Sequence, residues 1–379
     1  MRDAVIVGAV RTPTGKRNGG LAGVHSADLS ALVLQALVER TGVDPALVDD
    51  VVWGCVSQVG EQTFDIARTA VLSAGWPESV PGTTVDRQCG SSQQAVHFAA
   101  AGVVSGQYDL AVAGGVEVMS RTPMGSTFTA SPLGAKYQER YGSDFPNQGV
   151  GAEMIAEQWG FSRQQLDEFA LASHEKAAAA QDEGRFAGQI LPVATPDGVV
   201  SADEGVRRGG TLEKLASLKP AFKEDGMIHA GNSSQISDGA AALLLTTSEK
   251  ARELGLTPLA RVHTAVLAGS APMPMLTGPI PATQKALAKS GLRVDEIGVW
   301  ECNEAFASVP LAWLAEIGAD EKQLNPNGGA IALGHPLGGS GARIMTTLVH
   351  HMRDNGIRYG LQTMCEGGGQ ANATILELL

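Results

Sequence analysis

The sequence has few cysteines, few aromatic residues and no long apolar run. Its four cysteines, in 379 residues, form no CxxC pair and no disulfide framework. A disulfide-stapled secreted domain is therefore excluded, and the cysteines are expected to be free thiols with a chemical or packing role. No apolar stretch is long enough to span a bilayer, and no signal peptide is recognisable. Together these absences predict a cytoplasmic protein without membrane insertion.

Cationic residues are outnumbered as well. The 28 Lys and Arg residues face 40 Asp and Glu residues, a formal net charge of −12, so neither nucleic acid nor an anionic membrane is expected as a main partner. Aromatic residues make up only 5% of the chain, whereas Gly alone contributes 47 residues, a balance that suits helices packed tightly against a sheet. The length exceeds one comfortable core, which predicts two or more domains.

Cys89 is the centre of the most informative stretch, residues 83–105. Residues 83–85 predict the end of a short strand, and Gly90, Ser91 and Ser92 predict a tight turn whose serines cap a helix. The helix is expected to bury one stripe, formed by Ala95, Phe98, Ala99, Gly102 and Val103. Cys89 would then lie at a helix N-terminus, where partial positive charge favours the thiolate. The alternative is a small buried hydrophobic residue, which is common for free cysteine.

The remaining pattern alternates strands and helices at both ends of the chain. Strands are predicted at residues 4–10, 48–53, 110–113 and 240–246, and helices at residues 29–40, 162–183 and 249–254. The helix at 162–183 begins with a capping box of Ser162 and Gln165 and stops at Gly184. Between about residues 119 and 230 no long apolar strand is found, so this segment is interpreted as an insertion that carries binding loops.

The second half of the chain repeats the first. Residues 35–53 and 284–300 each predict the same order of features: a helix, a glycine, an acidic turn and a strand that ends in Trp. Cys89 and His335 are each followed by a helix and a glycine-rich strand. The repeat predicts two copies of one α/β unit, as two mixed sheets layered with helices, with Cys89 and His335 near a shared pseudo-twofold axis. Chance similarity of two such units is the alternative.

Three further clusters in the second half carry chemistry-bearing residues. Asn303 follows a strand and is expected to begin a helix, and His335 lies in a glycine-rich segment judged too flexible for a core helix. Cys365 ends a strand in a glycine turn, where backbone must approach something closely. Each has a structural alternative: an N-cap for Asn303, a surface loop for His335 and a buried strand thiol for Cys365.

The motifs VDRQCGSSQQA, NEAFA, NGGAIALGHP and CEGGG, in this order over essentially the whole chain, resemble the thiolase family. The resemblance implies an α/β, thiolase-like fold in which duplicated βαβαβ-type halves, residues 1–250 and 256–379, form a five-layered α-β-α-β-α core. It also implies that the inserted loop domain, residues 119–230, binds CoA. The implied activity is an acyltransferase that cleaves 3-ketoacyl-CoA to acetyl-CoA and a shortened acyl-CoA, or runs the reverse condensation, with a degradative direction expected. CoA and acetyl-CoA would be substrates, and neither a permanently bound cofactor nor a metal is expected.

The same resemblance assigns roles at the site. Cys89 would be the acyl-accepting nucleophile, and His335 would take its proton. Cys365 would move the proton at the carbon α to the thioester carbonyl. Asn303 would hold a water that lines one oxyanion hole with His335, and the backbone N–H groups of Cys89 and Gly367 would form the other.

Binding of anionic CoA by an acidic protein requires a local basic patch. The insertion supplies a basic run, whose alternative interpretation is a solvated charged face: Arg207, Arg208, Lys214, Lys219 and Lys223. The resemblance places Arg207 beside the adenine and Ser234 on the pantetheine arm, with Phe222 and Phe306 as walls of the same tunnel. It also implies a homodimer. Whether two dimers form a homotetramer depends on the loop at residues 122–141.

Several positions depart from the short-chain members of the family. Asn147 and Gln148 stand where those enzymes tend to show a His-Met pair against the acyl group, and Gln235 and Ser92 replace glycines. These departures predict a preference for a long or cyclic 3-ketoacyl-CoA over acetoacetyl-CoA. The motifs resemble those of bacterial thiolases that degrade long or ring-bearing, steroid-derived acyl-CoAs.

Two other functions remain open from the sequence. A ketoacyl synthase-type condensing enzyme would share the fold but lack a second catalytic cysteine, so Cys365 argues against it. A non-catalytic thiolase-like carrier of acyl-CoA or lipid would have no reason to keep Cys89, Asn303, His335 and Cys365 together.

Overall fold

A computed structural model describes residues 2–144 and 146–379. The N-terminal half consists of β1 (Val5–Arg11), β2 (Gly15–Lys16), α1 (Ser26–Thr41), η1 (Pro45–Leu47), β3 (Asp50–Gly54), η2 (Gly60–Gln62), α2 (Ile66–Ser73), β4 (Gly82–Val85), α3 (Ser91–Ser105), β5 (Leu110–Val118), β8 (Ser237–Thr246) and α8 (Ser248–Glu253). The C-terminal half consists of β9 (Ala260–Gly269), α9 (Pro279–Ser290), η3 (Val294–Glu296), β10 (Val299–Cys302), α10 (Ser308–Ile317), η4 (Glu321–Gln323), α11 (Ala330–Leu333), η5 (Leu337–Gly339), α12 (Ser340–Asn355), β11 (Tyr359–Glu366) and β12 (Gln370–Leu378).

The two halves have the same strand order. The N-terminal half runs β4-β3-β5-β8-β1, and the C-terminal half runs β10-β11-β12-β9. A single parallel bridge between Trp300 and Leu324 lies where β4 pairs with β3 in the first half. In the first half β3 and β5 pair in parallel, as β10 and β11 do in the second, and the pairs that follow them along the sheet are antiparallel. The duplication predicted from the repeat is therefore confirmed.

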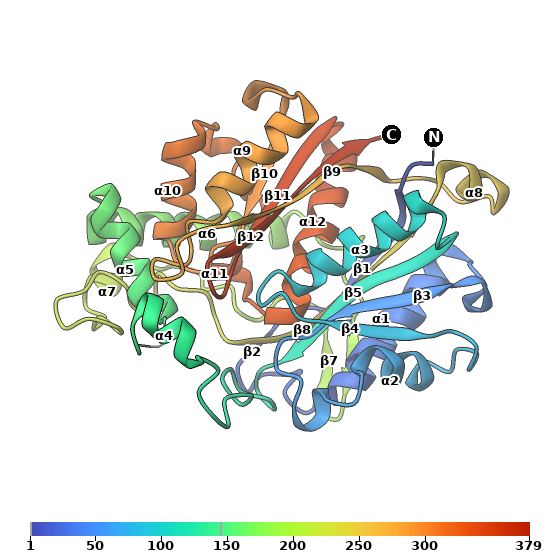
Figure 1. The fold of residues 1–379 in the computed structure, drawn as a ribbon, viewed down its shortest axis with the longest axis horizontal. Coiled ribbons are helices and arrows are strands. Elements are labelled where there is room, and N and C mark those ends of the chain that lie inside the picture. The colour runs from blue at the N-terminus through green and yellow to red at the C-terminus, as the bar shows by residue number, and fades with distance from the viewer. Residues whose placement is uncertain (1, 145) are drawn as a thin grey trace.

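The layers also follow the prediction, with one correction. From one side of the molecule to the other they are α1 and α2, the first half's strands, α3 and α12, the second half's strands, and α9 with α10 (Figure 1). The two sheets were expected to be separate, but β1 and β9 pair over two residues, Val5 with Arg261 and Ile6 with Ala260. Among the described residues this link joins the halves into one ten-stranded sheet, because the two equivalent strands meet at the centre of the duplication.

The repeated helix–strand units show why the two halves fold alike. Both α1 and α9 end at a glycine in the left-handed region, Gly42 at φ 72° and Gly291 at φ 75°, a conformation that glycine adopts without a Cβ penalty. A one-turn 3-10 helix follows each, and the next strand carries a fully buried Trp, Trp53 or Trp300. The tryptophans predicted to end these strands are thus anchors of the two cores.

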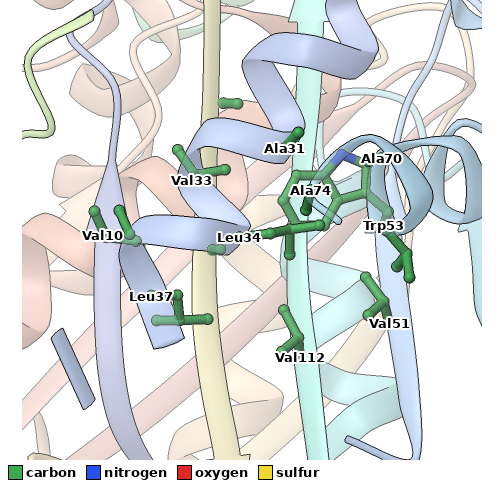
Figure 2. Close-up of a cluster of buried hydrophobic side chains, with 14 of the residues drawn as sticks. Val10, Ala31, Val33, Leu34, Leu37, Val51, Trp53, Ala70, Ala74 and Val112 are labelled. Carbon is green, nitrogen blue, oxygen red and sulfur yellow. The ribbon is translucent and has the colours of Figure 1, made fainter. Parts of the chain in front are cut away.

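Figure 2 shows the core of the first half, where Trp53 lies among aliphatic side chains of α1, α2 and β5. Leu34 and Leu37 project from α1, and Val112 from β5, toward the same apolar layer. All four side chains are at most 1% exposed. Truncation of a buried Trp to Ala costs about 3–5 kcal/mol in such a core, so this layer holds the sheet under the site rigidly.

The insertion contains more regular structure than expected. It comprises α4 (Ala135–Tyr141), α5 (Gln148–Trp159), α6 (Arg163–Asp182), α7 (Leu212–Ala216) and a small hairpin of β6 (Val193–Thr195) with β7 (Gly198–Val200). The hairpin escaped the sequence because its strands are too short to show an alternation. The predicted capping box of Ser162 and Gln165 is present, and Gly184 lies in the left-handed region. No helix within the described residues is both long and apolar enough to cross a membrane.

The prediction was wrong for one residue of the buried stripe of α3. Phe98 is 48% exposed, whereas Ala95, Ala99 and Val103 are fully buried. α3 is a central helix covered on several sides, so its buried surface includes polar residues and Phe98 faces away from the core. A central helix does not follow a one-sided apolar pattern.

Candidate active site

The loop between β4 and α3 holds Cys89 where the sequence predicted it. Gln88 adopts φ 49°, and the N–H of Gly90 donates to Arg87 O at 3.0 Å, which closes a tight turn. The serines do not cap α3 as expected, because Gly90 is the N-cap. Ser91 instead braces the turn: its hydroxyl accepts from Arg87 N at 2.9 Å and donates to Gln88 O at 2.6 Å. Cys89 is thereby fixed immediately before a helix.

The surroundings of Cys89 overturn one expectation from the sequence. Its side chain is 5% exposed and packs with Met119, Leu337, Ile344 and Met364. Burial raises the pKa of the Cys89 thiol well above its ordinary value, and the nearby Cys365 and Glu366 add to the rise. The thiolate is therefore not preformed at the helix N-terminus, because loss of solvation outweighs the helix charge. Cys89 needs a base to become a nucleophile.

His335 has the properties of that base. It is 4% exposed and so is not a surface loop residue. Its Nδ1 lies 2.6 Å from Ser340 Oγ, and that hydroxyl already donates its only proton to Pro336 O at 2.8 Å. Nδ1 must then carry the proton and donate it to Ser340, which leaves Nε2 as a bare acceptor. Nε2 is buried and has no hydrogen-bond partner among the described residues.

The charge state of His335 fits the same role. Burial lowers its pKa to about 3, with Arg343 contributing in the same direction, so the ring is neutral at physiological pH. Its backbone N–H is held by Ser237 Oγ at 3.1 Å and by Gln235 O at 3.2 Å. The preceding glycine-rich segment was judged too flexible for a core helix, yet it forms the buried turn α11. Packing on both sides orders it despite its glycines.

Cys365 is the penultimate residue of β11, and Glu366 separates it from the turn of residues 367–369, in which Gly368 has φ 83° and Gly369 φ 78°. The thiol is 1% exposed. Burial raises the pKa of Cys365 to about 12, Glu366 adds to the rise, and Asn303 opposes it. Cys365 is thus a neutral thiol that can donate a proton to a strongly basic centre.

The glycine turn lies directly against the Cys89 loop. A Cβ on Gly90 would overlap the Glu366 carboxyl, and a Cβ on Gly367 would lie 2.8 Å from Gln88 Oε1. Asn372 Nδ2, on β12, donates to Gly90 O at 3.1 Å. The close backbone approach predicted for this turn is confirmed, and it brings the segments of Cys89 and Cys365 together from opposite halves of the chain.

Asn303 lies at the end of β10, with its N–H bonded to Thr363 O at 3.1 Å. It does not begin a helix and is not an N-cap, because α10 starts only at Ser308 after Ala307. The side chain is 2% exposed, and neither amide atom has a hydrogen bond of normal geometry among the described residues. Its effect on the pKa of Cys365 places the amide beside that thiol. Apart from this contact with the Cys365 sulfur, the buried amide is left with hydrogen-bonding capacity that is suited to hold a bound molecule.

The residues predicted to contact CoA are brought together in part. The rings of Phe222 and Phe306 meet edge to face with centroids 5.8 Å apart. Ser234 N donates to Ala305 O at 2.9 Å, so Ser234 lies beside Phe306. Arg207 is exposed, and no hydrogen bond among the described residues joins it to these three; its N–H donates to His174 Nδ1 at 3.0 Å.

The predicted basic run has less unpaired positive charge than its five residues suggest. Arg208 pairs with Asp182 at 2.7 Å and Lys223 pairs with Glu157. Three members make no ion pair with any described residue: Arg207, Lys214 and Lys219. These three are the members of the run whose charge no described ion pair offsets.

The predicted acyl-pocket residues lie at the start of α5. Asn147 is its N-cap, and the side-chain oxygen accepts from Gly149 N at 2.9 Å and Val150 N at 3.2 Å. A Cβ on Gly149 would overlap the Phe222 ring, so the helix start abuts the aromatic pair. Gln148 is half-buried there. Its influence on acyl-chain length stays a prediction.

Two residues of the site were not found in the sequence. Ser340 orients His335 from the first turn of α12; a hydroxyl one turn beyond a histidine was the available signal. Glu117 is buried and accepts from Val56 N at 3.0 Å, Ser57 N at 3.1 Å and Gly338 N at 2.9 Å, which ties the His335 segment to β5. A lone Glu inside a strand gave no such signal. No described group of three or more His, Cys, Asp or Glu is placed to hold a metal ion.

Known proteins match the chain over almost its whole length. Residues 4–249 match the thiolase N-terminal domain, and residues 256–378 the thiolase C-terminal domain. The steroid 3-ketoacyl-CoA thiolase FadA6 of Mycobacterium tuberculosis is 50% identical over 388 residues, covering 100% of this chain and 95% of that protein. A 3-ketoacyl-CoA thiolase of Pseudoalteromonas translucida is 46% identical, covering 100% and 99%. The crystal structure of the Bacillus anthracis acetyl-CoA acetyltransferase superimposes with a TM-score of 0.92 at 40% identity, covering 100% and 99%.

Proposed function

The chain belongs to the thiolase family and is an acyltransferase, and from that premise we propose that it cleaves 3-ketoacyl-CoA through an acyl-enzyme on Cys89. The observation that carries the proposal is a neutral His335 with a bare Nε2, held at a site where two buried thiols from different halves meet. Cys89 packs against Leu337, two residues beyond His335. A base, a nucleophile and a proton donor are thus available in one buried site.

In the first step, His335 Nε2 takes the proton of Cys89, and the thiolate attacks the 3-keto carbon. The bond between C2 and C3 breaks, and its electron pair passes to C2 of the departing acetyl-CoA. Cys365 donates its proton to that carbon, which yields neutral acetyl-CoA and leaves Cys365 as a thiolate. A pKa of about 12 suits Cys365 to this task, because a carbanion is a strong base.

In the second step, the Cys365 thiolate takes the proton of the incoming CoA thiol. The CoA thiolate attacks the acyl group on Cys89, and the Cys89 sulfur leaves and recovers its proton from His335. Both thiols and the imidazole return to their starting states, so no further reactant is required. The products are acetyl-CoA and an acyl-CoA two carbons shorter.

Negative charge develops on two carbonyl oxygens during these steps. Asn303, with its unpartnered buried amide, and His335 would line the site for one of them, through a water. The backbone N–H groups of Cys89 and Gly367 would serve the other, since the glycine turn abuts the Cys89 loop. Fixed donors in a buried site stabilise such charge strongly, by roughly 3–4 kcal/mol for one donor.

CoA would bind on the inserted loop domain, residues 119–230, which lies within the N-terminal thiolase half at residues 1–250; residues 256–379 form the C-terminal half. Ser234, Phe222 and Phe306 lie together beside the site and suit the pantetheine arm. Arg207 suits the nucleotide end, because its side chain is exposed and makes no ion pair with a described residue. CoA and acetyl-CoA act here as substrates, with no permanently bound cofactor.

The substrate is proposed to be a long or cyclic 3-ketoacyl-CoA, in a degradative direction. The half-identical relative from Mycobacterium tuberculosis is named for a steroid 3-ketoacyl-CoA substrate. The capped start of α5 abuts Phe222 at Gly149, and its first residues are Asn147 and Gln148, where short-chain members of the family tend to have a His-Met pair. A panel of 3-ketoacyl-CoA thioesters of rising bulk tests this: a kcat/KM that is highest for acetoacetyl-CoA contradicts the assignment.

The partner is proposed to be a second copy of the chain, in a cytoplasmic homodimer. β4 is the last strand of the sheet, and Asp65 beside it accepts from Thr84 Oγ1 at 2.6 Å. Phe64, next to Asp65, is 92% exposed, and Phe98, on the helix α3 that packs against β4, is 48% exposed. An open strand edge flanked by exposed aromatic rings favours an isologous contact. The four free cysteines suit a reducing compartment.

The activity is tested by CoA-dependent loss of 3-ketoacyl-CoA absorbance with purified protein. We expect turnover in the wild type and a loss of at least a thousandfold in Cys89→Ala, since the nucleophile is removed. Binding of acyl-CoA without turnover would instead identify a carrier. Condensation without cleavage would identify a synthase.

A further inference from the structure

Glu366 is a buried carboxyl group that the reaction does not use. It ends β11 next to Cys365, and its side chain lies where a Cβ on Gly90, the neighbour of Cys89, would overlap it. The residue is completely buried, and neither carboxyl oxygen has a hydrogen bond of normal geometry among the described residues. One carboxyl thus touches the segments of both reactive thiols, and the backbone N–H of Asn372 is the hydrogen-bond donor that acts on it.

The charged neighbours of Glu366 come from the loop before Cys89. Arg87 faces it with a buried Nε that has no partner among the described residues, while Nη1 donates to Gln370 Oε1 at 2.9 Å. Asp86, on the same loop, adds a smaller negative charge. On the other sides lie the neutral Cys365 of its own strand and Asn372 on β12, whose backbone N–H lowers the pKa of Glu366 and whose neutral side-chain amide lies close by.

Burial dominates this balance. It raises the pKa of Glu366 to about 8, against the opposing charge of Arg87, so the carboxyl is uncharged at neutral pH and ionises in mildly alkaline solution. A negative Glu366 disfavours ionisation of both Cys89 and Cys365. A neutral carboxyl fills the same space without that effect.

We propose that Glu366 is a positioning residue that must be uncharged: its neutral carboxyl seats the glycine turn against the Cys89 loop, and its ionisation makes Cys89 a poorer nucleophile. The proposal rests on the function assigned to Cys89 above. Arg87 and Glu366 belong to the two motifs, DRQCGSS and CEGGG, that meet at this contact. Glu366 acts through the thiols and does not itself touch the reacting atoms.

The test measures alkylation of Cys89 by iodoacetamide between pH 6.5 and 9.5, read by peptide mass analysis, in wild type and Glu366→Gln. At pH 6.5 both carry a neutral side chain at 366, so the rates should agree within twofold. Above pH 8 the wild-type alkylation rate should drop below that of Glu366→Gln and reach about one tenth of it at pH 9.5. The reason is that a rise of about one in the pKa of Cys89, caused by the ionised Glu366, lowers its thiolate fraction about tenfold. A rate ratio that is constant across this range would overturn the proposal.

Arg87→Met provides an independent test in which Glu366 itself is unchanged. Removal of the positive charge should raise the pKa of Glu366 and move the break in the alkylation profile to higher pH, and Arg87→Met with Glu366→Gln should show no break. An unmoved break, or a break that persists in the double variant, refutes the role of Glu366. Alkylation reports on Cys89 whether or not it is acylated in turnover, so a failure here is distinct from a failure of the thiolase mechanism.

Discussion

Ser340→Ala is the variant that examines the base most closely. Ser340 Oγ accepts the Nδ1 proton of His335 at 2.6 Å and is held in place by its own bond to Pro336 O. Removal of the hydroxyl leaves a buried N–H without a partner and allows the proton to shift to Nε2, which then cannot accept from Cys89. The hydrogen bond also strengthens as His335 becomes charged in the transition state.

The expected loss follows from these two effects. An unpartnered buried donor costs roughly 1–3 kcal/mol, and if this loss falls on the transition state the acylation rate drops by about fivefold to a hundredfold. The assay is rapid-quench formation of acyl-enzyme from a 3-ketoacyl-CoA without added CoA. Substrate binding should be unchanged, because Ser340 lies behind the imidazole.

Matched variants separate orientation from simple destabilisation. Ser30 is also fully buried and also donates to the carbonyl four residues before it, Ser26 O at 2.8 Å, but lies on α1 away from the site. Ser30→Ala should lose a similar amount of stability in urea and keep its acylation rate, and Ser340→Thr should retain most of the rate. If Ser340→Ala acylates at the wild-type rate, or if Ser30→Ala is equally slow, the proposed tautomer control is wrong.

Four other outcomes are expected. Cys365→Ser should still acylate Cys89 but exchange the acetyl α-hydrogens with solvent at least a hundredfold more slowly, measured by NMR in D₂O; unchanged exchange would remove Cys365 from proton transfer. Gln148→Met should lower the kcat/KM ratio of a long or cyclic substrate to acetoacetyl-CoA by about tenfold, within the range that pocket shape supplies; an unchanged ratio would contradict the pocket assignment. The pKa of His97 is 6.5 in the unfolded chain and about 3 in the folded protein. Above pH 6.5 the ring is neutral in both states, whereas between pH 6.5 and 3 only the unfolded state is protonated, so the free energy of unfolding falls by up to about 1.4 kcal/mol per pH unit. His97→Gln should reduce this acid loss of stability in urea titrations, and an unchanged loss would exclude His97 as its source. Phe98→Glu should convert a dimer to a monomer in light scattering, and a dimer that persists would place the interface elsewhere.

The fold was largely predictable because it depends on local patterns that repeat. Continuous apolar strands such as β1, the glycine stops Gly42 and Gly291, and the buried Trp53 and Trp300 each carry their signal within a few residues. Phe98 was misplaced because burial of a central helix is decided by its neighbours from both halves.

At the site, the sequence predicted residues that the fold brings together but not their protonation. The motifs pointed to Cys89, His335 and Cys365, yet the thiolate expected at the helix N-terminus is opposed by burial. Desolvation depends on side chains distant in sequence, such as Leu337 and Met364 around Cys89. The hydroxyl of Ser340 and the carboxyl of Glu366 acquire their roles only when turns from opposite halves meet.

The most direct test of the account is the site of the covalent intermediate. Wild-type protein is mixed with a 3-ketoacyl-CoA in the absence of CoA, quenched in acid and digested for peptide mass analysis. The account predicts one acyl group, of the substrate length less two carbons, on Cys89, and none in Cys89→Ala. An acyl group on Cys365, or full turnover by Cys89→Ala, would contradict it.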